Sequence, residues 1–164
     1  MARCDHALPI TVAVASRDQV WMDCLSAQLG RRGLLVRELA LAVEPRAAVL
    51  AGVDVVVLDT QSLTSADLAT AQSMRRSFPL VEVVAIAGDS PVADAVRALR
   101  DGVFTVLQHP VAGDLLLESL VAAGRRHRHA QARFEELADA DAAAVRRRRR
   151  SVSTTATREG KRRP

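Results

Sequence analysis

The sequence V-D-V-V-V-L-D-T spans residues 53–60. It is a short run of β-branched residues that is apolar on both faces, which favours a central parallel strand covered by helices. Asp59 lies at the carboxyl end of this strand, the edge where open α/β sheets bind their ligands. From this run alone two interpretations of Asp59 stay open: a functional carboxylate, or a cap of the following loop.

Similar apolar runs recur on both sides of this stretch. Strands are predicted over residues 10–15, 34–39, 53–60, 81–87 and 103–107. Helices are predicted from a cap at Asp18 to about Arg32, from Pro45 to Gly52, from a cap at Ser65 to Ser77, from Pro91 to Asp101-Gly102, and from about Asp114 onward. The first of these helices should pack through Val20, Trp21, Cys24, Leu25 and Leu29. Alternation of strands and helices predicts an α/β fold with a doubly wound parallel sheet, because parallel neighbours need crossover connections.

Length and composition fit one domain plus an appendage, since the chain has 164 residues, of which 49% are hydrophobic. No run approaches the roughly 18 to 20 apolar residues of a membrane span, and the first residues, M-A-R-C-D-H, lack the apolar core of a signal peptide. A cytoplasmic protein that does not contact membranes is therefore expected. Cys4 and Cys24 are expected to be inert thiols, without a disulfide framework or a zinc site.

Charge is divided along the chain. Residues 1–121 hold ten Arg against fourteen acids, whereas residues 122–164 hold thirteen Lys and Arg against five acids. The sequence pI of about 10.3 therefore describes the tail and not the domain. The predicted domains are a folded domain over 8–124, a helical extension over 125–145, and a disordered arginine-rich tail over 146–164.

The extension is rich in alanine and free of proline, so the last helix is predicted to continue to about Val145. Gly124 is a candidate break, at a cost of about 1 kcal/mol. Apolar residues are too sparse to sustain heptads, which leaves a short homodimer contact as one option. The tail opens with five arginines, namely Arg146, Arg147, Arg148, Arg149 and Arg150. They are interpreted either as a solvated tail or as an arm that binds nucleic acid non-specifically through its phosphates.

With these elements in place, residues 10–121 resemble a response-regulator receiver domain, the CheY-like phosphoacceptor module of two-component signalling. The resemblance rests on V-D-V-V-V-L-D-T, with Asp59 as the candidate phosphoacceptor, on A-V-R-A-L-R-D-G-V-F-T-V-L at residues 95–107, and on the His109-Pro110 pair. It implies a flavodoxin-like fold, with a five-stranded parallel sheet in the strand order 2-1-3-4-5.

The chain departs from the receiver pattern at the positions that serve phosphorylation. Receivers hold magnesium with two acids after the first strand, and this chain has Ser16 and Arg17 there, with Asp18 beside them. Because a hard divalent cation needs clustered carboxylates, no metal site is predicted. We expect the Arg17 guanidinium to pair with Asp59 instead.

Three further positions differ from the family. Ala87 stands where receivers carry a hydroxyl, Val106 where they often carry an aromatic, and His109 where they carry a lysine. A competing interpretation of His109 is a loop histidine bonded to backbone. Without metal and cation clamps, Asp59 should be a poor phosphoryl acceptor.

The predicted function is an atypical stand-alone response regulator in two-component-type signalling. It would act through contact with a regulatory protein, a histidine kinase being one candidate, and without magnesium-dependent phosphorylation. Two alternatives stay open: a nucleic-acid-associated regulator that uses the basic arm, and a receiver still phosphorylated on Asp59. No enzyme activity and no cofactor are predicted, because no metal set, nucleophile-base pair or phosphate-cradling loop is found.

Overall fold

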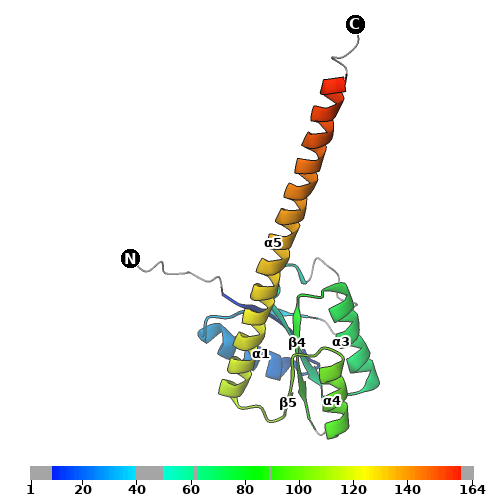
Figure 1. Cartoon of the computed structure of the whole chain (residues 1–164). Coiled ribbons are helices and arrows are strands. Elements are labelled where there is room, and N and C mark those ends of the chain that lie inside the picture. Colours follow the sequence, from blue (N-terminus) through cyan, green and yellow to red (C-terminus); the bar gives the residue numbers. More distant parts are fainter. Residues whose placement is uncertain (1–8, 40–49, 61–62, 89, 160–164) are drawn as a thin grey trace. The chain divides into compact units, whose positions relative to one another are not determined.

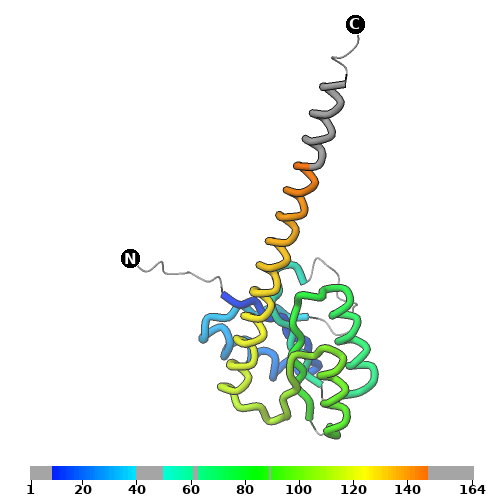
Figure 2. Tube along the Cα trace, viewed as in Figure 1, coloured from blue at the N-terminus to red at the C-terminus, as the bar shows by residue number. Residues whose placement is uncertain are grey.

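The computed structural model describes the backbone of residues 9–39, 50–60, 63–88 and 90–159, and side chains within these ranges up to residue 147 (Figure 2). It divides into two compact units, Met1–Arg128 and His129–Pro164, and each unit is described by itself. The first unit ends at Arg128, and the predicted domain boundary is residue 124. The helix predicted over 45–52 lies largely outside the described residues.

The first unit is built on one parallel sheet of five strands. These are β1 (Thr11–Ala15), β2 (Leu35–Glu38), β3 (Val55–Thr60), β4 (Glu82–Ala87) and β5 (Thr105–Gln108). Their spatial order is β2-β1-β3-β4-β5, which confirms the predicted topology. The helices are α1 (Gln19–Arg31), α3 (Ser65–Ser77), α4 (Val92–Arg100) and α5 (Gly113–Glu159). Helices α3 and α4 lie on one side of the sheet, and α1 and the first part of α5 on the other (Figure 1).

The central strand β3 is buried on both faces, as its apolar run predicts. Val56 and Leu58 pack into the core beneath α3, while Val55 and Val57 pack into the core beneath α1 and α5. Successive strand residues point to opposite faces, so each apolar face of the strand supplies one of the two cores. This double coverage fixes the register that places Asp59 at the carboxyl edge.

Helix α1 begins as predicted, since the Asp18 side chain accepts a hydrogen bond from the Trp21 amide. Its packing face differs from the prediction. Met22, Leu25 and Leu29 are the buried residues of the helix, whereas Val20 is 74% exposed. Their spacing of three and four residues gives a stripe that is rotated from the predicted one.

Helix α3 begins one residue earlier than predicted, because Thr64 and not Ser65 is its N-cap. The Thr64 hydroxyl oxygen accepts a hydrogen bond from the Asp67 amide at 3.2 Å, and the Asp67 carboxylate accepts one from the Thr64 amide at 3.0 Å. This reciprocal capping box satisfies two backbone donors at once, which a cap at Ser65 would not do.

Helix α5 continues past Gly124 to Val145 as predicted, and the candidate break at Gly124 does not occur. The helix then reaches Glu159, whereas disorder was predicted from residue 146. Between residues 125 and 159 the sequence contains neither glycine nor proline, and arginine and alanine are both good helix formers. Local propensity therefore favours helix to about residue 150, whereas the following S-V-S-T-T-A-T consists mostly of weaker helix formers.

Candidate functional site

Asp59 lies where the sequence predicts it, at the carboxyl end of β3. Strand β3 pairs with β4 so that Asp59 is opposite Ile86 and Thr60 is opposite Ala87. The side chain of Asp59 is 12% exposed, which leaves the carboxylate largely enclosed but still in contact with solvent. A carboxylate at this depth keeps its charge best when neighbouring groups donate hydrogen bonds to it.

Two side chains supply those contacts. The Ser16 hydroxyl donates a hydrogen bond to Asp59 Oδ2 at 2.6 Å, and His109 Nε2 lies 2.6 Å from Oδ1. Ser16 follows β1 and His109 follows β5, so three strand ends meet at one carboxylate. Both Asp59 oxygens are thereby engaged by side chains of the chain itself.

The loop after β1 is held by its own short contacts. The Asp18 amide donates to Ser16 Oγ at 3.0 Å, and the Asp18 carboxylate is used to cap α1. Arg17 is exposed, and among the described residues no ion pair of Arg17 is found. The predicted pairing of Arg17 with Asp59 is therefore wrong. The shorter Ser16 and the facing His109 reach the carboxylate instead.

His109 is fixed by its backbone as well as by its ring. Its amide donates to the Ala87 carbonyl at 2.8 Å, and its peptide bond to Pro110 is cis. The ring also meets Trp21 edge to face, with centroids 5.7 Å apart. His109 thus bonds a side chain in the site, unlike the loop histidine of the competing interpretation.

The other two positions that differ from the receiver family, Ala87 and Val106, contribute packing only. Ala87 is 2% exposed and belongs to the core beneath α3, and half-buried Val106 packs against the same core. Neither carries a polar side-chain atom. The nearby Thr60 hydroxyl donates to the Ile86 carbonyl at 3.3 Å. A phosphoryl group on Asp59 would gain no hydrogen bond from the side chains of Ala87 or Val106.

Magnesium does not fit this donor set. The ion takes oxygen ligands in near-octahedral geometry and favours carboxylates, but Ser16 directs its proton at Asp59 and Asp18 caps α1. Within the described parts of the chain, no group of three or more His, Cys, Asp or Glu side chains could hold a metal ion. A guanidinium next in sequence to Ser16 adds a charge that repels a cation.

The predicted nucleic-acid-binding arginines lie in the second unit. Their backbone is helical, because α5 covers residues 146–150. Arg146 and Arg147 are exposed, and the side chains of Arg148, Arg149 and Arg150 lie outside the described set. The chain also has no described helix that is long and apolar enough to cross a membrane.

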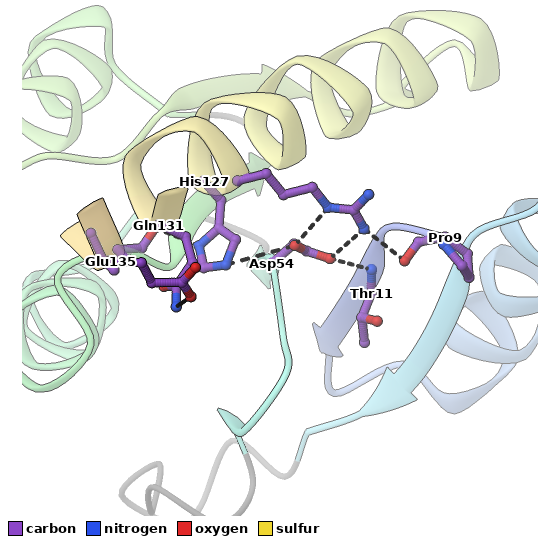
Figure 3. A network of polar contacts seen from close by, with 8 residues as sticks. Pro9, Thr11, Asp54, His127, Gln131 and Glu135 are labelled. Carbon is purple, nitrogen blue, oxygen red and sulfur yellow. Dashed lines mark hydrogen bonds and ion pairs between the residues drawn. The ribbon is translucent and has the colours of Figure 1, made fainter. Parts of the chain in front are cut away.

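Sequence reasoning missed a second charged cluster, at the amino edge of the sheet (Figure 3). Asp54, just before β3, is 7% exposed and accepts a hydrogen bond from the Thr11 amide at 2.7 Å. Arg128 of α5 donates through Nε to Asp54 Oδ1 at 3.2 Å and through Nη2 to Oδ2 at 3.3 Å. His127 Nε2 lies 3.6 Å from Oδ1, and its Nδ1 bonds the Leu80 carbonyl.

Glu82, the first residue of β4, forms the other half of this cluster and is 3% exposed. Its Oε1 pairs with Arg126 Nε at 3.2 Å, and its Oε2 pairs with Arg75 Nη1 at 3.5 Å. The Arg126 guanidinium also lies 5.6 Å from the centroid of the Phe104 ring. The signal in the sequence was an acid at the start of two otherwise apolar runs, V-D-V-V-V and V-E-V-V. Such acids stay charged inside a protein only when paired.

The parallel sheet in the order 2-1-3-4-5, with helices on both faces and an acid at the end of β3, defines a flavodoxin-like α/β protein. Comparison with solved structures identifies a narrower group of proteins within the flavodoxin-like class that share this fold. The chain has the fold of response-regulator receiver (CheY-like) domains, which confirms the resemblance at the level of fold.

A response regulator receiver domain protein from Clostridium thermocellum superimposes with a TM-score of 0.62 at 18% identity, over 73% of this chain and 97% of that one. A CheY-like receiver domain protein from Methanospirillum hungatei gives 0.62 at 15% identity, over 74% and 98%. An adenylate cyclase from Rhodopirellula baltica gives 0.66 at 18% identity, over 79% and 98%. No protein-family model matches the chain, and no curated protein sequence matches it.

Proposed function

We propose that this protein is an atypical stand-alone receiver that signals by binding a regulatory protein, without magnesium-dependent phosphorylation of Asp59. One observation carries the proposal. Both carboxylate oxygens of Asp59 are engaged within the chain, by Ser16 and by His109, each at 2.6 Å. A phosphoacceptor must instead present a free oxygen to the incoming phosphoryl group, beside groups that neutralise the developing charge.

The surroundings of Asp59 lack those groups. The acids that would hold magnesium are replaced by Ser16 and Arg17, and Ala87 offers no hydroxyl. Phosphoryl transfer depends almost entirely on positioning and electrostatic stabilisation, so the loss of the metal ligands removes the largest contribution. Asp59 is then better explained as a hydrogen-bonding carboxylate that joins the loops after β1 and β5, and not as a phosphoryl acceptor.

A surface for a protein partner is available on α4. Val92, Val96 and Leu99 are 80%, 41% and 48% exposed, and their spacing places them on one face of the helix. Exposed apolar residues that gather on one face are typical of protein-protein contacts. With the adjoining strand β5, this face supports binding of a regulatory protein, with a histidine kinase as one candidate. Fold similarity to the Rhodopirellula baltica adenylate cyclase does not extend that activity to this chain, because activity resides in sites and not in folds.

Acetyl phosphate with magnesium tests the proposal directly. The intact mass of the full chain should stay unchanged, because Asp59 lacks the metal and cation contacts that transfer requires. The matched control is Asp59→Asn, which removes the candidate acceptor carboxylate. A gain of one phosphoryl group in the wild type that is absent from Asp59→Asn would show that phosphorylation survives.

The charge of the arginine-rich segment supports a second candidate function, a regulator that holds nucleic acid through residues 146–150. Thirteen basic residues against five acids follow residue 121, and phosphate contacts made by arginine do not require a folded reading domain. Retention on immobilised DNA across a salt series, compared between the full chain and a version that ends at Val145, tests this function. Equal and negligible retention of the two chains would remove it.

A further inference from the structure

The imidazole ring of His109 has one nitrogen that the chain binds and one that it leaves open. Nε2 lies 2.6 Å from Asp59 Oδ1, whereas Nδ1 has no hydrogen-bond partner among the described residues. The side chain of His109 is 32% exposed. Among the described side chains, the polar atoms that are buried without a partner are Ser26 Oγ and Glu82 Oε2, so solvent reaches Nδ1. Nδ1 can therefore bond a group from outside the chain.

The bonds around Asp59 decide which ring nitrogen of His109 carries the proton. The Ser16 hydroxyl oxygen accepts a hydrogen bond from the Asp18 amide at 3.0 Å, and the Ser16 proton is directed at Asp59 Oδ2. An ionised carboxylate only accepts hydrogen bonds, so the contact at Oδ1 requires a proton on His109 Nε2. In the neutral ring the lone pair then lies on Nδ1. Nδ1 is therefore a nucleophile and not a donor.

The orientation of this ring is fixed from several sides. The His109 amide donates to the Ala87 carbonyl at 2.8 Å, and the ring meets Trp21 edge to face with centroids 5.7 Å apart. Together with the bond to Asp59, these contacts hold Nε2 toward the carboxylate and Nδ1 away from it. A nucleophile that is already oriented loses little entropy when it reacts.

We infer that His109 Nδ1 accepts a phosphoryl group from a nitrogen-linked donor, the class that phosphoramidate represents. A neutral imidazole does not repel an anionic phosphoryl group as the Asp59 carboxylate does. Positive charge that develops on the ring faces Asp59 through the Nε2 proton. The exposed guanidinium of Arg17, next in sequence to Ser16, favours an anionic group at this edge over an uncharged acyl group. The inference rests on the proposed function, in which Asp59 binds a hydrogen and not a phosphoryl group.

The transfer balances without a further reactant. The Nδ1 lone pair forms the new N–P bond while the P–N bond of the donor breaks. The electron pair of that bond stays on the donor nitrogen, so the ammonium form of phosphoramidate releases neutral ammonia. The ring keeps its proton on Nε2, in the bond to Asp59. Acetyl phosphate would release a carboxylate anion, whose developing charge calls for the metal and lysine contacts that Ser16, Arg17 and His109 replace, so it should be a poor donor.

Phosphoramidate in the presence of a magnesium chelator tests the inference on the full chain. After an alkaline quench, which phosphorylated histidine survives, the intact mass should show a rapid gain of one phosphoryl group. His109→Gln should lower the initial rate at least about tenfold, because its amide can still donate to Asp59 but offers no ring nitrogen. The matched control is His129→Gln, which removes an exposed histidine and should leave the rapid gain unchanged.

Nuclear magnetic resonance of the phosphorylated wild type locates the group without any substitution, and it should lie on Nδ1. Asp59→Asn then tests Asp59 as a positioning residue. A neutral amide no longer enforces the proton on Nε2, so the rate should fall about tenfold or more and the share of product on Nε2 should rise. A purely structural loss would not change which nitrogen is modified. Far-UV circular dichroism and the thermal midpoint report whether each variant is folded.

Three results would overturn the inference: no phosphoryl gain in the wild type with phosphoramidate, equal rates in the wild type and His109→Gln, or attachment to Nε2 in the wild type. All three leave the proposed function standing. The proposed function fails on a different result, a phosphoryl gain from acetyl phosphate and magnesium that hydroxylamine cleaves and that Asp59→Asn abolishes, since hydroxylamine attacks acyl phosphates.

Discussion

The two edges of the sheet use charge in opposite ways. At the amino edge, two buried acids, Asp54 and Glu82, are paired with arginines from α3 and α5. At the carboxyl edge, Asp59 faces a serine hydroxyl and a histidine, and Arg17 beside it is exposed. The ion pairs with arginine thus lie at the amino edge, whereas α/β sheets bind their ligands at the carboxyl edge.

The two edges contribute differently to the stability of the fold. Breaking a buried ion pair leaves an uncompensated charge, so the amino edge is tied to the stability of the fold. It joins residues 126–128 of α5 to Asp54 before β3 and to Glu82 at the start of β4. Asp59 is bonded by a serine hydroxyl and an imidazole and by no guanidinium, so we expect its removal to cost less than the removal of Asp54 or Glu82.

The largest effect is expected for Asp54→Asn. Arg128 and His127 would lose their carboxylate partner in a nearly dry site, and the free energy of unfolding should fall by about 2–3 kcal/mol. Partial exposure of Arg128 keeps the cost below that of a fully buried pair. Urea unfolding followed by Trp21 fluorescence measures the change.

The matched control is Asp114→Asn, which breaks an ion pair with Arg32 on the surface. Both side chains are more than half exposed, at 84% for Asp114 and 60% for Arg32. Its cost should stay below about 1 kcal/mol. Equal losses in the two variants would contradict the assignment of a structural role to the amino edge.

The next largest effect is expected for Gly124→Ala, because Gly124 of α5 lies close to Ile10, just before β1. A Cβ at Gly124 would lie 2.8 Å from Cγ2 and 2.9 Å from Cδ1 of Ile10. Gly124→Ala gains up to about 1 kcal/mol of helix propensity but overpacks this contact, and a net loss of about 1 kcal/mol is expected. Thermal and urea unfolding of the full chain measure it.

Two further variants sharpen this result. Ile10→Ala removes the atoms that clash, so Gly124→Ala should cost less in that background, and the double-mutant cycle should give a favourable coupling. A Cβ added at Gly30 of α1 would meet no described atom within 4 Å, so Gly30→Ala should raise stability by about 0.5–1 kcal/mol. A rise for Gly124→Ala as well would refute the close contact.

Much of the structure of the carboxyl edge could be predicted from the sequence. The buried run of β3 and the alternation of strands and helices predicted the sheet order and the place of Asp59, because both follow from periodicity and from the chirality of crossover connections. The partners of Asp59 were harder to predict. Ser16 and Arg17 are neighbours in sequence, and Coulomb attraction favoured the arginine, but the reach and direction of each side chain decided the contact.

The amino edge shows why the rest could not be predicted. Asp54 and Arg128 are 74 residues apart, and nothing in their spacing pairs them. Gly124 illustrates the same limit, since propensity describes it as a weak point of the helix, whereas the structure requires it for the approach to Ile10. Tertiary contacts override local preference at such positions.

The smallest effect is expected from magnesium, and it tests whether the carboxyl edge has lost its metal site. A ligand that binds only the native state raises the free energy of unfolding by RT ln(1 + L/Kd), where L is the concentration of free ligand. Because Ser16 and Arg17 offer no carboxylate, millimolar magnesium should leave the thermal midpoint and the Trp21 fluorescence of the wild type unchanged. A saturable shift in either property would count against the proposed function.

Installing two acids provides the positive control for that result. S16D/R17D adds two carboxylates beside that of Asp59. Without metal, repulsion among the three should lower the thermal midpoint below that of the wild type. Magnesium should then restore stability, by about 1.4 kcal/mol at ten times its dissociation constant. Adding Asp59→Asn to this variant should weaken the response, because clustered carboxylates hold the ion. If magnesium changes the thermal midpoint of neither S16D/R17D nor the wild type, the loop after β1 prevents binding, and the absence of the two acids is not the cause.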